Sequence, residues 1–248
     1  MSLSDEELER YARHIVLPQV GGVGQRRLKQ ASVAIVGAGG IGSAVIPALG
    51  GAGVGKLTII DSDVVELANL HRQPLFTEGD AGKPKAELAA EFVRQLNHFV
   101  EVDAKQERID TGNAEPLLAG HDLIVDGSDN FATRLAVSDA CVALGTPLLS
   151  AAAAQFQGQV GLFRSEPCYR CFVGDAFDSD DCDNCAELGV LGAMTASVGS
   201  FAALVAVNSI MGVGPDHAGQ LHLFDGEALS WRAIRIPADP ACRACGSS

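Results

Sequence analysis

The sequence predicts an α/β fold: a doubly wound, mostly parallel sheet with an antiparallel extension toward the C-terminus. Short apolar, β-branched runs alternate with helical segments over the first 150 residues, which is the pattern of parallel strands joined by crossover helices. A glycine-rich turn, Gly37 to Gly42, directly follows the first of these runs. After residue 155 the pattern changes to short strands, an acidic loop and one long apolar helix.

The elements follow from local signals along the chain. Ser4 and Glu7 have capping-box spacing and predict a helix to about Val16, followed by a short basic helix that ends near Gln30. Pro84 suits the first position of a helix that runs to about Asn97. The predicted parallel strands are Ser32–Val36, Leu57–Ile60, Phe99–Ala104, Leu123–Val125 and Pro147–Ala151. The other predicted helices run to about Leu49, follow Thr111, and span Asn130–Leu144.

The C-terminal part of the chain contains the predicted antiparallel strands Gln159–Phe163, Leu221–Asp225 and Trp231–Ile236. An uncharged stretch from Leu188 to Pro215 is long enough to cross a bilayer. This stretch contains several serines as well as Thr195 and Asn208, and no Lys or Arg flanks it. These features favour a buried helix that begins near Leu188. We expect a single domain over residues 1–248, with halves 1–155 and 156–248.

Composition limits the function. The chain has 248 residues, 47% hydrophobic and 20% charged, with 18 basic against 31 acidic side chains and a net charge of -13. Such an acidic surface argues against long nucleic acid or an anionic membrane as the main partner. The N-terminal segment is acidic and amphipathic and has no signal-peptide pattern. We therefore expect a cytoplasmic protein.

The glycine-rich turn predicts a nucleotide site. Gly37, Gly39, Gly40 and Gly42 lie in a Gly-x-Gly-x-x-Gly pattern between a strand and a helix, the Rossmann-like context that admits a phosphate. Asp61 ends the second strand 19 residues later, where an acid binds a ribose hydroxyl. The segment Gly50–Leu57 imitates a phosphate loop, but it leads from a helix into a strand and lacks the hydroxyl residue. We interpret it as a helix C-cap with a solvated Lys56.

The residues that follow the other strands distinguish between two classes of nucleotide-binding enzyme. Ligands bind beyond the carboxyl ends of the strands, so Arg72, Lys85 and Asp129 are expected to converge beside the phosphates. A triphosphate with magnesium needs two cations and an acid, whereas a nicotinamide-dependent oxidoreductase, the rival hypothesis, does not. The same loops contribute Asn69, Gln73 and Asn130.

Six of the seven cysteines form three Cys-x-x-Cys pairs, which in a chain without an export signal indicate thiols or metal. A tetrathiolate zinc site takes two pairs. The first, Cys168 and Cys171, has 10 residues between it and Cys182 and Cys185, and 70 between it and Cys242 and Cys245. Spacing allows either, while pairing with the third would tie down a Pro-rich tail. Cys141 is expected to be a core thiol.

In these motifs the chain resembles the ThiF/MoeB/HesA family, bacterial relatives of ubiquitin-activating enzymes. The ordered matches are Arg10-Tyr-x-Arg13, the glycine turn, Asp61, Asn69-Leu-His-Arg-Gln73, Gly82-Lys-Pro-Lys85, Asp126-Gly-Ser-Asp-Asn130, Pro167-Cys-Tyr-Arg-Cys171, Cys185-Ala-Glu-Leu-Gly-Val190 and the terminal cysteines. His14 stands where many members have Gln. The resemblance implies ATP-dependent adenylylation of a small ubiquitin-like sulfur carrier that ends in Gly-Gly, by a homodimer that uses magnesium and structural zinc.

The resemblance also implies roles for residues. ATP or magnesium would contact Gly40, Asp61, Asn69, Arg72, Lys85, Asp129 and Asn130. Arg13 would reach the partner subunit's ATP, and zinc would be held by Cys168, Cys171, Cys242 and Cys245. Cys185 aligns with a loop cysteine that bonds to sulfur, received from a cysteine desulfurase or rhodanese type of donor; Cys182 adds a second loop thiol. An activating-enzyme half without catalysis and a tRNA-modifying dehydratase are the alternatives, and the pathway (molybdopterin, thiamine or tRNA thiolation) stays open.

Overall fold

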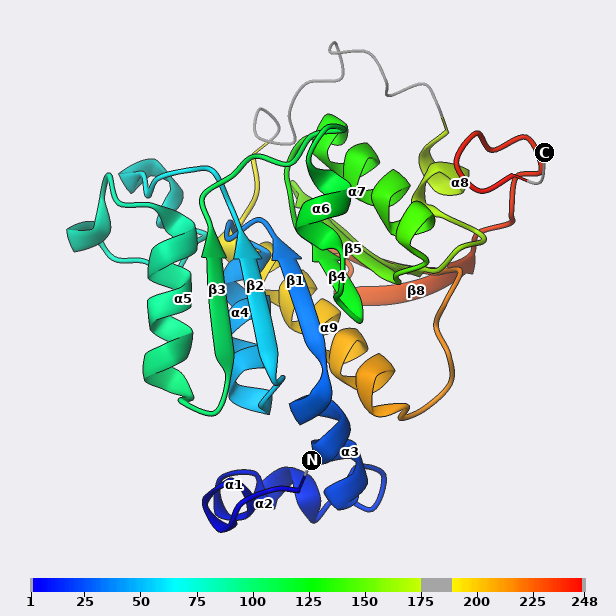
Figure 1. Cartoon of the computed structure of the whole chain (residues 1–248). Helices are drawn as coiled ribbons and strands as arrows, with labels where there is room; N and C mark the ends of the chain where they lie inside the picture. Colours follow the sequence, from blue (N-terminus) through cyan, green and yellow to red (C-terminus); the bar gives the residue numbers. More distant parts are fainter. Residues whose placement is uncertain (1, 175–188, 247–248) are drawn as a thin grey trace.

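The computed structural model describes residues 2–174 and 189–246 and contains one eight-stranded sheet in the order β3-β2-β1-β4-β5-β6-β7-β8 (Figure 1). The first five strands in this order pair in parallel, and the β5–β6, β6–β7 and β7–β8 pairs are antiparallel. The predicted fold class is therefore confirmed. The strands are β1 Ser32–Val36, β2 Lys56–Ile60, β3 Glu101–Lys105, β4 Leu123–Asp126, β5 Leu148–Ala154, β6 Gln157–Phe163, β7 Gln220–Asp225 and β8 Ser230–Arg235.

Most helices lie close to the predicted positions, with small shifts at their ends, whereas the short helix Tyr169–Val173 and two 3₁₀ turns were not predicted. The helices are α1 Asp5–Arg10, α2 Ala12–Ile15, α3 Gly21–Gln30, α4 Gly42–Ala52, α5 Lys85–Leu96, α6 Ala114–Leu118, α7 Phe131–Leu144, α8 Tyr169–Val173 and α9 Gly192–Met211, with 3₁₀ turns η1 Leu67–Asn69 and η2 Glu78–Asp80. Pro84 is the N-cap of α5 and not its first residue. Helix α9 begins at Gly192, four residues later than expected from Leu188.

The N-terminal helix is interrupted, contrary to the single helix predicted. The capping box of Ser4 and Glu7 is present, but the helix breaks at Tyr11 into α1 and α2. The Tyr11 ring is buried, and its hydroxyl accepts a hydrogen bond of 2.8 Å from the side-chain amide of Asn97. The break is thus held by a contact with a residue 86 positions away, which local sequence signals do not reveal.

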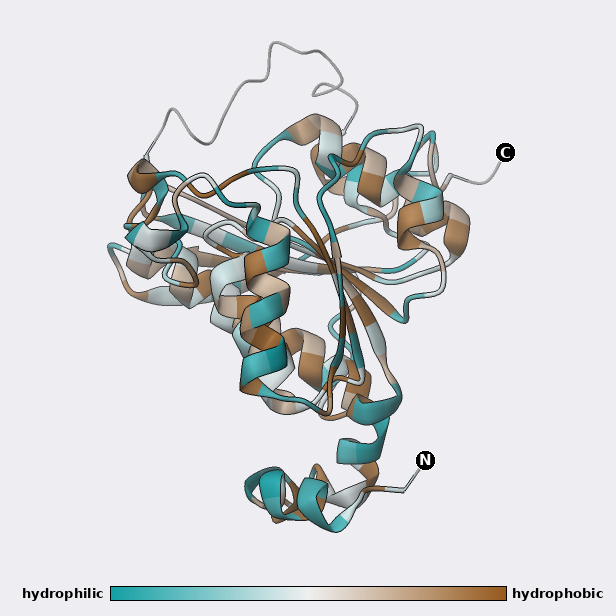
Figure 2. Cartoon of the chain, turned by 60° about the vertical axis from the view of Figure 1, so that its left-hand side comes forward, coloured by the Kyte–Doolittle hydropathy of each residue, from teal (hydrophilic) through white to brown (hydrophobic). Residues whose placement is uncertain are grey.

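Two hydrophobic cores cover the two faces of the sheet, because alternate residues of a strand point to opposite sides. Val33 and Ile35 of β1 face a core shared with α4, α5 and α9, while Ala34 and Val36 face α6, α7 and α8. Hydrophobic residues follow the central strands, and hydrophilic residues cover much of the N-terminal helices (Figure 2). Helices cover both faces of the sheet and leave the ends of the strands open. The site forms at the carboxyl ends of the parallel strands.

Helix α9 is the one helix of the described residues long and apolar enough to cross a membrane, yet half of its most apolar stretch is buried inside the protein. It packs against α4, β5 and β6. The segment that imitates a phosphate loop is a helix C-cap, as predicted: Gly53 ends α4 with a φ of 80°, in the left-handed region that favours glycine. Lys56 is only partly solvated, because it pairs with Glu101 and Asp103 at 2.7 and 2.9 Å.

Candidate active site

A cavity of about 500 Å³ lies at the carboxyl ends of the parallel strands, within the range of roughly 300–1,000 Å³ usual for small-molecule sites. Every parallel strand contributes to its wall. The glycine turn follows β1, residues 61–63 follow β2, residues 107–109 follow β3, and residues 127–130 follow β4. Ala152 and Ala153 of β5 close one side, beside Gly189 and Val190.

The glycine turn is packed too tightly for larger residues. A Cβ added at Gly40 would lie 2.9 Å from the Cγ2 of Thr195, at the start of α9. Asp61 holds the turn from the other side: one of its carboxylate oxygens accepts the Ala38 N–H at 2.7 Å, and the other accepts the Asp63 N–H at 2.8 Å. Burial raises the pKa of Asp61, and these two N–H donors partly oppose that rise. Asp61 therefore shapes the turn in addition to facing the cavity.

The two cations expected at the phosphates line the same cavity. Arg72 is half-buried, and its guanidinium lies 2.9 Å from the Nε2 of His71. Lys85, the first residue of α5, is buried, and its Nζ lies 3.1 Å from the Oδ2 of Asp63. Both cations thus reach the cavity wall from the segment between β2 and β3.

The loop after β4 supplies an acid, and the 69–73 segment supplies an amide. Asp129 is exposed at the cavity wall, and the Asn130 side chain caps α7 by accepting the Thr133 N–H at 2.8 Å. Gln73 is buried, and its Oε1 has no hydrogen-bond partner among the described residues. A buried acceptor without a partner costs free energy, so this oxygen suits a ligand that donates a hydrogen bond or a metal-bound water.

Among the described residues, three residues predicted for the nucleotide site are not part of the cavity wall: Gly42, Asn69 and Arg13. The side-chain amide of Asn69 donates to the Oε2 of Glu66 at 3.3 Å. Arg13 is exposed on α2, and α1 to α3 lie at the end of the sheet opposite to the arrowheads of the parallel strands β1, β2 and β3 (Figure 1). Cys185 and its neighbour Cys182 lie outside the described residues.

Sequence reasoning missed several wall residues. Asp63, Glu107, Arg108 and Arg134 also line the cavity. Arg134 is buried in α7 and donates to the Ser128 carbonyl, and to the Ser150 hydroxyl and the Ala151 carbonyl at 3.0 Å each. Residues 107 and 108 follow the carboxyl end of β3, so the rule that located Asp61 and Asp129 would have found them.

The balance of charged side chains at the cavity wall differs from that of the whole chain. Among the residues that the structure describes, four basic side chains line it, those of Arg72, Lys85, Arg108 and Arg134, together with four acidic ones, those of Asp61, Asp63, Glu107 and Asp129. The whole chain carries a net charge of -13. In this acidic protein the described part of the cavity wall thus carries equal numbers of both signs, which reduces the repulsion that an anionic ligand would meet.

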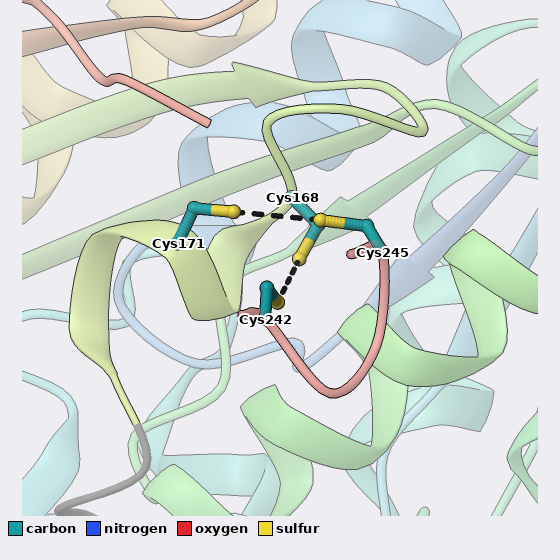
Figure 3. Close-up of side chains that lie close together, drawn as sticks. All are labelled: Cys168, Cys171, Cys242 and Cys245. Carbon is teal, nitrogen blue, oxygen red and sulfur yellow. Dashed lines mark hydrogen bonds between the residues drawn. The ribbon is translucent and has the colours of Figure 1, made fainter. Parts of the chain in front are cut away.

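Four cysteine sulfurs form a second candidate site. The Sγ atoms of Cys168, Cys171, Cys242 and Cys245 all lie within 4.8 Å of one another (Figure 3). The first lies 3.6 Å from that of Cys242, and the second 3.4 Å from that of Cys245. Tetrahedral zinc with Zn–S bonds of about 2.3 Å would set the sulfurs about 3.8 Å apart, so the cluster fits the ion.

Neighbouring contacts fix this cluster to the body of the protein. Arg170, between the first two cysteines, binds both carboxylate oxygens of Asp139 on α7, at 2.6 and 2.8 Å. The Asp239 N–H donates to the Cys171 sulfur at 3.5 Å. The seventh cysteine, Cys141, is a buried core thiol as predicted, and burial raises its pKa to about 12, with the charge of Asp126 as a lesser cause.

Comparison with known proteins adds the family. The ThiF family profile matches residues 11–244. The chain belongs to the ThiF family. It is 44% identical to a sulfur carrier protein adenylyltransferase of Thermus thermophilus, over 99% of this chain and 93% of that protein. It is 40% identical to the SAMP-activating enzyme E1 of Haloferax volcanii, over 99% and 92% of the two chains.

Other ThiF-family relatives are longer. The match to adenylyltransferase and sulfurtransferase MOCS3 of Anopheles gambiae is 40% identical and covers 99% of this chain but 56% of that protein. Among solved structures, E. coli MccB with ATP has a TM-score of 0.84 at 23% identity, over 98% of this chain and 75% of that chain. At this identity the likeness supports the fold alone.

Proposed function

We propose that this ThiF-family protein adenylylates the C-terminal glycine carboxylate of a small ubiquitin-like sulfur carrier with ATP and releases pyrophosphate. One observation carries the proposal: Arg72, Lys85 and Asp129 line the same cavity as the glycine turn. Two relatives that match almost end to end have names that describe activation of such a carrier, and this favours adenylylation over hydride transfer and over a tRNA-modifying dehydratase.

The reaction needs no general base. A C-terminal carboxyl group has a pKa of about 3.3–3.7, so the carrier arrives as an anionic nucleophile. Its oxygen attacks the α-phosphorus, an acyl–phosphate bond forms, and the bond to pyrophosphate breaks with the electron pair leaving on the pyrophosphate oxygen. Arg72 and Lys85 neutralise the charge that develops, and the N-terminal end of α4 adds its dipole. The remaining ATP contacts in the proposal are Gly37, Gly39, Gly40, Gly42, Asp61, Asn69, Gln73 and Asn130.

Magnesium belongs to the proposal through Asp129. Its carboxylate is exposed at the cavity wall, and carboxylates together with substrate phosphates are the usual magnesium ligands. When bound, the ion would screen the negative charge of the phosphates. Asp129 would hold that ion against the triphosphate while the two cations hold the other side.

A homodimer completes the proposed site. Helix α2 lies at the opposite end of the sheet from this chain's own cavity (Figure 1), which supports a role for Arg13 in another subunit. We propose that Arg13 binds the phosphates of the partner subunit's ATP. Asn69 would turn from Glu66 toward the nucleotide when ATP binds.

The other assignments belong to the same proposal. Cys168, Cys171, Cys242 and Cys245 would hold one structural zinc ion, and residues 1–155 and 156–248 would form the nucleotide and carrier halves of one domain. Cys185 would receive the carrier or its sulfur, with sulfur from a cysteine desulfurase or rhodanese type of donor, in the cytoplasm.

Carrier-dependent exchange of labelled pyrophosphate into ATP tests the function. A purified carrier ending in Gly-Gly should support exchange, and the same carrier without its last glycine should not. ATP with magnesium should also raise the unfolding temperature, because a ligand that binds only the folded state stabilises it. Stabilisation by NAD, without exchange under any carrier, would point to the oxidoreductase instead.

A further inference from the structure

Asp63, a residue of the cavity wall, forms an ion pair with the buried Lys85. The side chain of Lys85 is 4% exposed, whereas that of Asp63 is 64% exposed. Among the described residues, Asp63 is the one carboxylate within 4.0 Å of the Lys85 ammonium, at 3.1 Å. A buried ammonium needs a charged or polar partner to offset its lost hydration. Asp63 supplies that partner from the solvent side of the cavity.

The backbone brings the two side chains together. Val64 and Pro84 form an isolated antiparallel bridge, and the Lys85 N–H donates to the Asp63 carbonyl at 3.0 Å. This bridge joins the segment after β2 to the first residue of α5. The ion pair is therefore built on a fixed backbone contact and not on two free surface side chains.

The same residue is linked to the glycine turn. The Asp63 N–H donates to one oxygen of Asp61, whose other oxygen accepts the Ala38 N–H within the turn. One chain of contacts thus runs from the backbone of the glycine turn through two carboxylates to the Lys85 ammonium. Displacement of Asp63 would change where that ammonium lies relative to the turn.

We propose that Asp63 is a positioning residue, which holds the Lys85 ammonium at the cavity wall without itself touching the nucleotide. The inference rests on the proposed function, because it takes Lys85 to be a phosphate contact. When the triphosphate arrives, the ammonium already lies at the wall and does not need to be ordered during the reaction. The benefit appears both in ATP affinity and in the adenylylation rate.

Asp63→Ala tests this in the full-length protein. With saturating carrier and magnesium, pyrophosphate exchange should fall about 10- to 100-fold, equivalent to about 1.4–2.8 kcal/mol at about 1.4 kcal/mol per tenfold. Asp63→Glu should recover part of the rate. Glu78→Ala is the matched control, because it removes one exposed acid outside the cavity wall and should keep the wild-type rate.

A double-mutant cycle on ATP affinity separates positioning from other roles. In a Lys85→Ala background, Asp63→Ala should weaken ATP binding by less than twofold, because Asp63 acts through the lysine. Additive losses, or a higher magnesium requirement in Asp63→Ala, would make Asp63 a direct ligand and overturn the proposal, as would a wild-type exchange rate. Lack of carrier-dependent exchange in the wild-type protein would instead refute the proposed function.

Discussion

Truncation of the tail before Ala241 should release one zinc ion per chain. The deletion removes Cys242 and Cys245 and leaves two thiols of a cluster whose four sulfurs lie within 4.8 Å of one another. Structural zinc is four-coordinate, so two thiolates do not retain it. We expect a fall from about one to about zero zinc per chain, because one such cluster holds one ion.

The loss of stability follows from linkage. Zinc at a thousand times its dissociation constant stabilises a folded chain by about 4 kcal/mol. The cluster is coupled to the whole fold, because Cys168 is buried and Arg170 binds Asp139 on α7 through two hydrogen bonds. For a chain of about 150–250 residues, each 1 kcal/mol shifts the unfolding temperature by about 2–4 °C. We therefore expect a decrease of about 8–16 °C.

Metal analysis and thermal unfolding, each with and without a chelator, measure both effects. The wild-type unfolding temperature should fall on chelation, and that of the truncated chain should not change. Cys141→Ala is the control for loss of a buried cysteine and should keep its zinc. Retention of zinc after truncation, or loss of zinc in a Cys182→Ser, Cys185→Ser double variant, would show that the first pair binds zinc with the loop pair.

Three further predictions address the reaction. Asp129→Asn should abolish pyrophosphate exchange, because an amide is a poor magnesium ligand; wild-type exchange would remove Asp129 from the site. Arg13→Ala and Arg72→Ala chains should each be inactive but regain exchange when mixed, and activity no higher than that of either parent would rule out action across a dimer. Cys185→Ser should keep exchange and lose thiocarboxylate formation when a sulfur donor is supplied; an unchanged yield would mean that sulfur attacks the acyl-adenylate directly.

The strands and most helices could be predicted because their signals are local. Buried β-branched runs such as Ser32–Val36 read as parallel strands, and the glycine turn placed the cavity at their carboxyl ends. The predicted start of α9 was wrong because no side chain caps the N-terminus of this helix, where the N-cap residue is Leu191. The uncharged sequence before it offers no stop signal, so the prediction extended the helix too far.

The missed contacts are those set by tertiary structure. Asp63 lies two residues after Asp61, yet its pairing with Lys85 depends on a bridge between segments about 20 residues apart. The hydrogen bond between Tyr11 and Asn97 joins residues that are still farther apart in the sequence. Spacing within one segment does not encode either contact. The cysteine cluster differs, because each Cys-x-x-Cys pair can be recognised from its local sequence. Only the choice of the second pair required the fold.

The single continuous sheet has a mechanical consequence. In the part of the chain that the structure describes, strands β4 to β7 are joined by backbone hydrogen bonds across the boundary between the two proposed halves. These bonds oppose rotation of the halves as separate rigid bodies. Movement that accompanies the reaction falls to segments that leave the sheet, where fewer hydrogen bonds must break. The amides of β5 and β6 should then be among the slowest to exchange with deuterium, throughout the reaction cycle as well as at rest.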